Sequence, residues 1–245
     1  MNEESMEPLK KSNRVNVFVD ESGDFYNDRW NVIAFVHCPL LEEKNYQKEF
    51  SALLAANGWD LTTFHATSMN PQQKNEFSIQ LNESFKDKEL GVFIAIFDMK
   101  NRDNAKDFYI EALLAAMYGF MFGTPARTTE TQYYFYLENR KTAYDFSSMT
   151  KILKAEANMD GAKLLGGDLF IFNMPKNERP LMALADLTAN LGLQYCRAKQ
   201  DMVLDLVESP RIIPFSSIEH FRTAIKDLLP YQRSQINEIR KARID

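Results

Sequence analysis

Five runs of β-forming residues, each ended by a turn or by the start of a helical pattern, constrain this chain most. The runs are Val15–Asp20, Trp30–Cys38, Gly91–Asp98, Gln132–Leu137 and Asp168–Phe172. The first alternates apolar and polar residues before the turn Ser22-Gly23, so it predicts a hairpin with the second. The fourth is apolar on both faces, as expected for a central strand.

Helical patterns fill the intervals between these runs. Two helices, Glu42–Ala56 and Pro71–Phe85, form an insertion between the second and third strands. Further helices are expected at 103–121, 144–158, 180–199, 217–228 and 231–241. Helices that alternate with later strands predict parallel pairing there, whereas the first three strands predict an antiparallel meander.

This order resembles a ribonuclease H-like core, an α/β fold in which a mixed sheet is flanked by helices. We therefore expect a ribonuclease H-like domain over residues 15–200, with the helical insertion at about 40–88. A flexible N-terminus, 1–14, precedes it, and a C-terminal helical extension, 201–245, follows it. The resemblance is one of fold, and a fold alone does not establish an activity.

Composition narrows the class of protein. The 245 residues are 45% hydrophobic, and no apolar run is long enough to span a bilayer. Cys38 and Cys196 lie far apart, which is typical of free thiols in a reducing compartment, so we expect a cytoplasmic protein that does not bind a membrane. The net charge of -5 argues against non-specific coating of nucleic acid, but it permits a nuclease with a local basic surface.

Three carboxylates stand where strands or a late helix could bring them together. Asp20 ends the first strand, Glu138 follows the central strand, and Asp186 is the only charged residue between Leu181 and Tyr195. Two divalent ions about 4 Å apart can activate water and stabilise the leaving oxygen of a phosphodiester. Mg²⁺ or Mn²⁺ would take such oxygen ligands.

Each of these residues also has a structural interpretation. Residues 20–24, Asp-Glu-Ser-Gly-Asp, hereafter the acidic hairpin, have the composition of a polar turn. Strand alternation sends Asp20 and Glu21 to opposite faces, so one is a ligand and the other supporting. Glu138 can pair with Arg140, and Asp186 can belong to a polar helical stripe, continued by Asn190, Gln194 and Arg197.

Histidines and cysteines add little to a metal site. His65, between the two insertion helices, can transfer protons or ligate a metal, although a lone histidine is more often structural. Glu111, in the helix after the third strand, is a weaker acidic candidate. No Cys/His pair has zinc spacing, and no phosphate loop, dinucleotide fingerprint or nucleophile elbow occurs.

Four short motifs resemble one family. Residues 17–24, Val-Phe-Val-Asp-Glu-Ser-Gly-Asp, look like the opening signature of the domain-of-unknown-function family numbered 3800. Residues 64–66, Phe-His-Ala, are similar to its histidine motif, and 97–100, Phe-Asp-Met-Lys, to its strand ending in lysine. Residues 180–187, Pro-Leu-Met-Ala-Leu-Ala-Asp-Leu, resemble its late helix.

That family is regarded as ribonuclease H-like, with a predicted nuclease activity, and is common in bacteria and their mobile elements. The resemblance implies Asp20, Glu138 and Asp186 as metal ligands, with Glu21 and His65 nearby. The chain departs from the pattern at Ala183, where the family has Gln, at Thr63, where it often has an acidic residue, and at Leu137-Glu138-Asn139, which lacks a clear Asp.

The leading hypothesis is a metal-dependent nuclease that uses Mg²⁺ or Mn²⁺ on nucleic acid. A catalytically inactive ribonuclease H-like binding or regulatory module is the alternative, motivated by the acidic charge, the departures and a basic cluster at Arg233, Arg240, Lys241 and Arg243. A hydrolase of small phosphorylated molecules is a third reading. No oligomeric state is predicted.

Overall fold

A computed structural model describes most of the sheet and the helices on one of its faces. The described residues are 14–24, 28–98, 131–138, 169–175 and 178–198, together with 109, 112, 113, 116, 117, 120, 213 and 214. Residues 1–13, Glu111, Arg140, the helix expected at 144–158 and the two expected after residue 216 lie outside this set.

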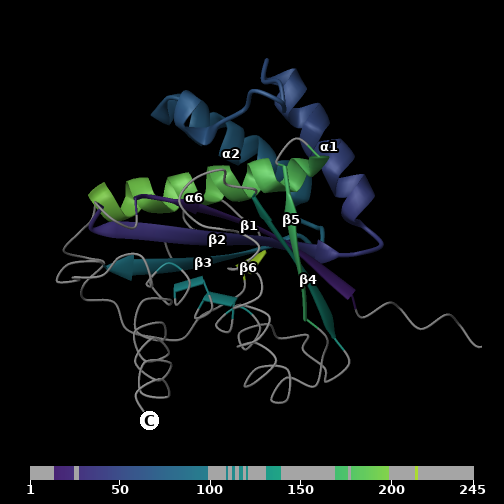
Figure 1. The fold of residues 1–245 in the computed structure, drawn as a ribbon. Helices are drawn as coiled ribbons and strands as arrows, with labels where there is room; N and C mark the ends of the chain where they lie inside the picture. The colour runs from purple at the N-terminus through teal and green to yellow at the C-terminus, as the bar shows by residue number, and fades with distance from the viewer. Residues whose placement is uncertain are drawn as a thin grey trace, which may run out of the picture.

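Five strands and one short strand form a single mixed sheet (Figure 1). They are β1 (Arg14–Ser22), β2 (Trp30–Pro39), β3 (Gly91–Asp98), β4 (Gln132–Glu138), β5 (Leu169–Met174) and β6 (Ile213–Pro214). The order across the sheet is β5-β4-β1-β2-β3-β6. Strands β1, β2 and β3 pair antiparallel, whereas β4 pairs parallel with both β1 and β5. The α/β arrangement expected from the sequence, an antiparallel meander joined to parallel strands in one mixed sheet with flanking helices, is confirmed.

The β1–β2 hairpin depends on a glycine. Gly23 follows the last residue of β1 and has φ of +104°, a conformation that glycine adopts without steric cost. A Cβ at this position would lie 2.7 Å from the Trp30 carbonyl oxygen and 2.7 Å from Asn31 Oδ1. The turn can therefore close only around a glycine, which holds the carboxyl end of β1 in register with the start of β2.

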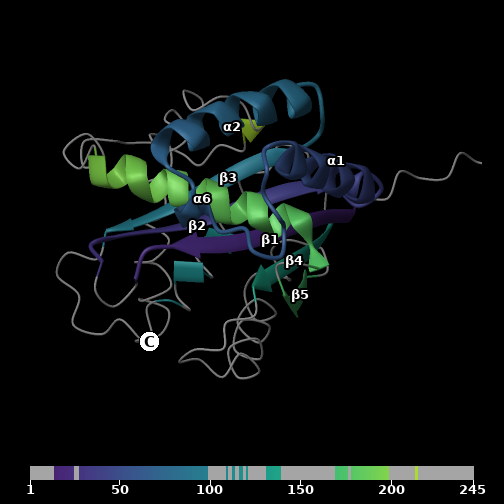
Figure 2. The same cartoon turned by 90° about the horizontal axis from the view of Figure 1, so that it is seen from above.

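Three helices cover one face of the sheet (Figures 1 and 2). They are α1 (Glu43–Ala56), α2 (Pro71–Phe85) and α6 (Pro180–Ala198), and a 3₁₀ turn, η1 (Ala66–Ser68), lies between α1 and α2. Helix α6 packs on β1 and β2 and touches η1 and α1. Asn70 and Gln73 form a capping box at the start of α2, so this insertion helix begins where its sequence predicts.

The opposite face is covered by a buried helical stripe. Its described members, at helical spacing, are Tyr109, Ala112, Leu113, Ala116, Met117 and Phe120. The Phe120 ring packs against Phe35 and Phe135, with centroids 5.6 and 5.9 Å away. The central strands are thus buried on both faces, which explains why β4 carries aromatic and apolar residues on both of its faces.

One buried carboxylate joins three elements on the first face. Glu43, the first residue of α1, accepts hydrogen bonds from Asn16 of β1, Gln47 of α1 and Arg179 beside α6. Arg179 also pairs with it as an ion pair. The three donors compensate a charge that would be costly to bury alone, so the starts of α1, β1 and α6 are tied together.

Strand β6 was not expected. Ile213–Pro214 pairs antiparallel with Gly91 and Val92 of β3, in a region for which the sequence predicts only helices. Two residues are too few for the periodicity that reveals a strand. Within the described residues, no helix is both long and apolar enough to cross a bilayer.

Half-buried His37 makes folding stability sensitive to acid. Burial lowers the pKa of His37 from 6.5 to about 4, because an imidazolium would lose its hydration. The unfolded chain therefore takes up a proton below pH 6.5 that the folded chain refuses until about pH 4. Stability should fall by roughly 3 kcal/mol over this window.

The His37→Phe variant isolates this effect. The difference in free energy of unfolding between variant and parent, measured by urea denaturation from pH 7.5 to pH 4, should grow as the pH decreases. Carboxylates titrate in both proteins and cancel in the difference. A difference that does not change with pH would contradict the assignment.

Candidate functional site

Asp20 is a buried carboxylate near the end of β1. Its side chain is only 2% exposed, and its Oδ1 accepts a hydrogen bond from the Glu21 backbone N–H at 2.8 Å. The alternation of β1 sends Asn16, Phe18 and Asp20 to one face, and the Asn16 bond to Glu43 identifies this face as the one covered by α1 and α6. Asp20 therefore points toward the helix layer.

Glu138 ends β4 on the same face as Asp20. The parallel register pairs Phe18 with Tyr136 and Val19 with Leu137, so the next step along both strands brings Asp20 and Glu138 opposite each other. The Phe18 and Tyr136 rings, two residues earlier, stack 5.3 Å apart, which shows that side chains at these positions project together. Neighbouring strands are about 4.8 Å apart, so the backbone positions of Asp20 and Glu138 lie side by side.

Glu21 points to the other face of the sheet. Its Oε1 accepts a hydrogen bond of 3.0 Å from the Tyr109 hydroxyl, which belongs to the buried stripe on that side. The alternation predicted for Asp20 and Glu21 is thus observed. Asp20 shares a face with Glu138, and Glu21 does not.

Asp186 meets the Phe64-His65-Ala66 motif. The Ala66 backbone N–H donates to Asp186 Oδ2 at 3.0 Å, and His65 Nδ1 lies 4.0 Å from the same oxygen. The His65 side chain is 65% exposed, whereas that of Asp186 is 14% exposed. Two motifs separated by 120 residues thus form one acid–imidazole pair, open to solvent on the histidine side.

Helix α6 runs along β1 in the same direction. Near its start, Arg179 shares the Glu43 carboxylate with Asn16 of β1. Near its end, Arg197 donates to Asp28 Oδ2 at 3.0 Å, in the loop that joins β1 to β2. These two anchors fix the direction of α6 and its position along β1.

The anchors place Asp186 close to the level of Asp20. From Arg179 to Asp186 the helix rises about 10 Å, and from Asn16 to Asp20 the strand rises about 13 Å. Arg179 and Asn16, from which these two rises are measured, both bond the Glu43 carboxylate. The two rises differ by less than the pitch of one helical turn. Because α6 packs directly on β1, Asp186 lies on the helix that covers the strand of Asp20.

The polar stripe of α6 is buried at Asn190 and exposed at Gln194 and Arg197. Asn190 is buried and accepts hydrogen bonds from Lys74 Nζ at 2.7 Å and from Gln194 at 3.2 Å. Lys74, on α2, is 3% exposed. Burial lowers the pKa of Lys74, while the negative charge of Asp186 opposes this shift. Lys74 therefore donates to Asn190 and also interacts electrostatically with Asp186, one turn earlier on α6.

Lys74 was missed because it lies in a polar segment, Gln72-Gln73-Lys74-Asn75-Glu76. One signal could have found it: Lys74 shares the spacing of Phe77, Ser78, Leu81 and Phe85, the buried face of α2. A lysine on an apolar face requires a polar partner, and Asn190 is that partner.

The residues that could hold a divalent ion are the carboxylates of this region. Among the described residues, no three His, Cys, Asp or Glu side chains are already grouped as a ligand set. Mg²⁺ commonly binds through one or two carboxylates together with water and substrate phosphates. Asp20 and Glu138, at the ends of neighbouring strands, are the carboxylates of this region that could serve as such ligands.

Comparisons with known proteins bear on the overall arrangement alone. A scan against models of protein families gives no match, and neither does a search of curated proteins. Two solved structures are similar over most of their length. One is ribonuclease HII of Archaeoglobus fulgidus, solved in complex with PCNA: 12% identity, TM-score 0.45, 94% of this chain and 91% of that chain covered. The other is ribonuclease H2 of Pyrococcus horikoshii OT3: 11% identity, TM-score 0.48, 93% and 99% covered.

The hydrogen bond between Tyr109 and Glu21 should contribute to the stability of the fold. Tyr109→Phe removes a hydroxyl that donates to the buried Glu21 carboxylate, so it should destabilise the protein by about 1–3 kcal/mol. A double-mutant cycle with Glu21→Gln, followed by urea denaturation, measures the coupling between the two side chains. Coupling within experimental error of zero would show that this hydrogen bond does not support the fold.

Proposed function

We propose that this protein is a metal-dependent phosphodiesterase of the ribonuclease H-like type that acts on nucleic acid. The observation that carries the proposal is the β1–β4 register, which sets Asp20 beside Glu138 at the carboxyl ends of two parallel strands. In open α/β sheets, ligands bind outside the carboxyl ends of strands where the connections diverge. β1 occupies that position, with β2 on one side and β4 on the other.

Asp20, Glu138 and Asp186 would hold the metal in this proposal. Bound Mg²⁺ or Mn²⁺ would supply a nucleophilic water and charge stabilisation for the phosphoryl oxygens. Asp20 and Glu138 contribute oxygens that neighbouring strands hold in place. Asp186 contributes from α6, where the Ala66 N–H orients its carboxylate.

Residues around Asp186 have supporting tasks in the proposal. His65 is exposed and lies 4.0 Å from Asp186, so it can carry a proton between the site and solvent. Lys74 contributes positive charge next to Asp186 and limits the repulsion between neighbouring carboxylates. Glu21 keeps β1 in place from the opposite face through Tyr109.

The family resemblance supports the same assignment. Its histidine motif and its late helix meet at Asp186, and its opening signature contributes Asp20 on the strand against which α6 packs. Membership of the domain-of-unknown-function family numbered 3800, with residues 15–200 as one domain, is part of this proposal.

Loss of the proposed ligands should abolish cleavage. Asp20→Asn, Glu138→Gln and Asp186→Asn each keep the side-chain size and remove a charge. Each should reduce Mn²⁺- or Mg²⁺-dependent cleavage by about 100-fold or more, since the bound metal supplies several kcal/mol of transition-state stabilisation. The measurement is initial rate on a panel of single-stranded, duplex and hybrid oligonucleotides and on small phosphate esters.

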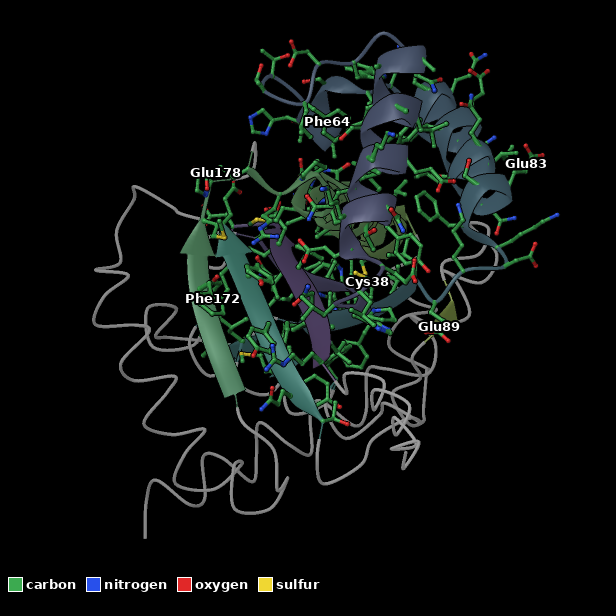
Figure 3. All side chains as sticks on the ribbon, turned by 90° about the vertical axis from the view of Figure 1, so that its right-hand side faces the viewer. Cys38, Phe64, Glu83, Glu89, Phe172 and Glu178 are labelled. Carbon is green, nitrogen blue, oxygen red and sulfur yellow. The ribbon has the colours of Figure 1, made fainter. Side chains whose placement is uncertain are left out.

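Glu83→Gln is the matched control. Glu83 is an exposed carboxylate on α2, on the far side of the helix layer from β4 and β5 (Figure 3), and its loss should leave the rate unchanged. Cleavage that survives Asp20→Asn together with Asp186→Asn would refute the proposed site. Cleavage confined to small esters would replace nucleic acid as the substrate.

An inactive binding module is the second candidate. It is favoured by the finding that the described residues contain no three-residue ligand group. Calorimetry with Mn²⁺ separates the two functions. For the enzyme we expect binding that Asp20→Asn abolishes and Glu83→Gln preserves. Absence of binding at millimolar Mn²⁺ would favour the module.

A further inference from the structure

Three stacked aromatic rings cross the sheet from its centre to its edge. Phe18 of β1 stacks on Tyr136 of β4 at 5.3 Å and 16°. Tyr136 stacks on Phe172 of β5 at 5.3 Å and 20°. All three lie on the face that carries Asp20 and Glu138, because Phe18 and Tyr136 precede those residues by two positions on the same strands.

The outer end of this stack is partly exposed, and no described helix packs on it. Phe18 is fully buried, whereas Phe172 is 39% exposed, and β5 is the edge strand of the sheet. The inward side of the Phe172 ring meets Tyr136 and also Tyr134, at 6.1 Å and 2°. The helices lie mainly over β1 and β2, and Figure 3 shows Phe172 on β5 away from α1 and α2. One more ring could therefore continue the stack.

Two arginines accompany the aromatic row. The guanidinium of Arg179 lies 4.8 Å from the centre of the Tyr136 ring, and that of the exposed Arg14 lies 5.9 Å from the centre of the Tyr134 ring. Arg179 is shared with Glu43, whereas Arg14 hydrogen-bonds the neutral Gln132 side chain. In a chain of net charge -5, this edge combines aromatic faces with positive charge.

We propose that this edge binds single-stranded nucleic acid, with one base stacked on Phe172 and the backbone beside Arg14. Aromatic rings next to cationic side chains are the features that hold unpaired strands. A duplex offers no free base face, because its bases stack on one another. The inference rests on the proposed function in one respect: Glu138 lies two residues, about 7 Å, beyond Tyr136 along β4, so the bound strand would lead to the proposed metal ligands.

The test is direct binding without cleavage. Fluorescence anisotropy of a labelled oligothymidylate in EDTA and low salt measures affinity when no metal is present. Phe172→Ala and Phe172→Leu should weaken binding about 5- to 150-fold, the range for losing one stacked base, while Phe172→Trp should retain it. Arg14→Gln should reduce the slope of log affinity against log salt by about 0.7.

Ile79→Ala is the matched control. Ile79 is a 51% exposed apolar residue on α2, so its removal should not alter the affinity. Phe172→Leu keeps an apolar side chain at the edge, and thermal melting checks that each variant is folded. An oligonucleotide with abasic sites should bind parent and Phe172→Leu equally.

Several results would overturn the proposal. They are equal affinity of parent and Phe172→Ala, equal loss in Ile79→Ala, equally tight binding of a duplex, or no binding up to about 0.1 mM protein, the weak end of non-specific binding. In the last case a partner protein would be the occupant of the edge. Asp20→Asn should leave binding in EDTA intact, so loss of cleavage and loss of binding report separately on the two proposals.

Discussion

The pairing of β1 with two different neighbours is the constraint on which the rest of the structure depends. β1 pairs antiparallel with β2 and parallel with β4, so it is the strand at which the meander ends and the parallel part of the sheet begins. Its register with β4 sets Asp20 beside Glu138. A slip of one residue would send Asp20 to the opposite face, among the buried side chains around Phe120, where a carboxylate would be costly.

The buried carboxylate of Glu43 fixes α6 relative to β1 at one end of the helix. It bonds β1 through Asn16 and the start of α6 through Arg179, so the helix and the strand are fixed relative to each other at one end. The Arg197–Asp28 pair fixes them at the other. Buried polar groups of this kind add little net stability but specify one arrangement over its alternatives. Here they specify how far along β1 the α6 residue Asp186 lies.

Strands and helix faces could be read from the sequence because they depend on local periodicity. The bounds of β3 and α2 agree with the predicted ones to the residue, and α6 begins at Pro180 as expected. The alternation of side chains along a strand also predicted that Asp20 and Glu21 point to opposite faces of the sheet. These features need only the spacing of apolar residues along one segment.

Contacts between distant segments could not be read in this way. Nothing in Thr63-Phe64-His65-Ala66 indicates that its backbone donates to Asp186, and nothing around Lys74 names Asn190 as its partner. The stack that ends at Phe172 needs three strands in one order, while the sequence shows only three separate aromatic residues. Pairing of β6 with β3 likewise rests on tertiary proximity rather than on any pattern in Ile213–Pro214.

The residues of the two proposed sites differ in exposure, from buried Asp20 to exposed His65 and Phe172. The carboxylate of Asp20 is enclosed by the sheet and the helix layer, which weakens its contact with water and strengthens its interaction with any bound cation. His65 and Phe172, by contrast, lie at the solvent boundary. A small substrate would need a closed pocket around the carboxylates, whereas a polymer needs sheltered charge at one point and accessible stacking and proton-transfer groups around it. Under the proposed function, β1, β4, β5 and α6 would serve the second case, since among the described residues α6 packs mainly on β1 and β2 and Phe172 of β5 is 39% exposed.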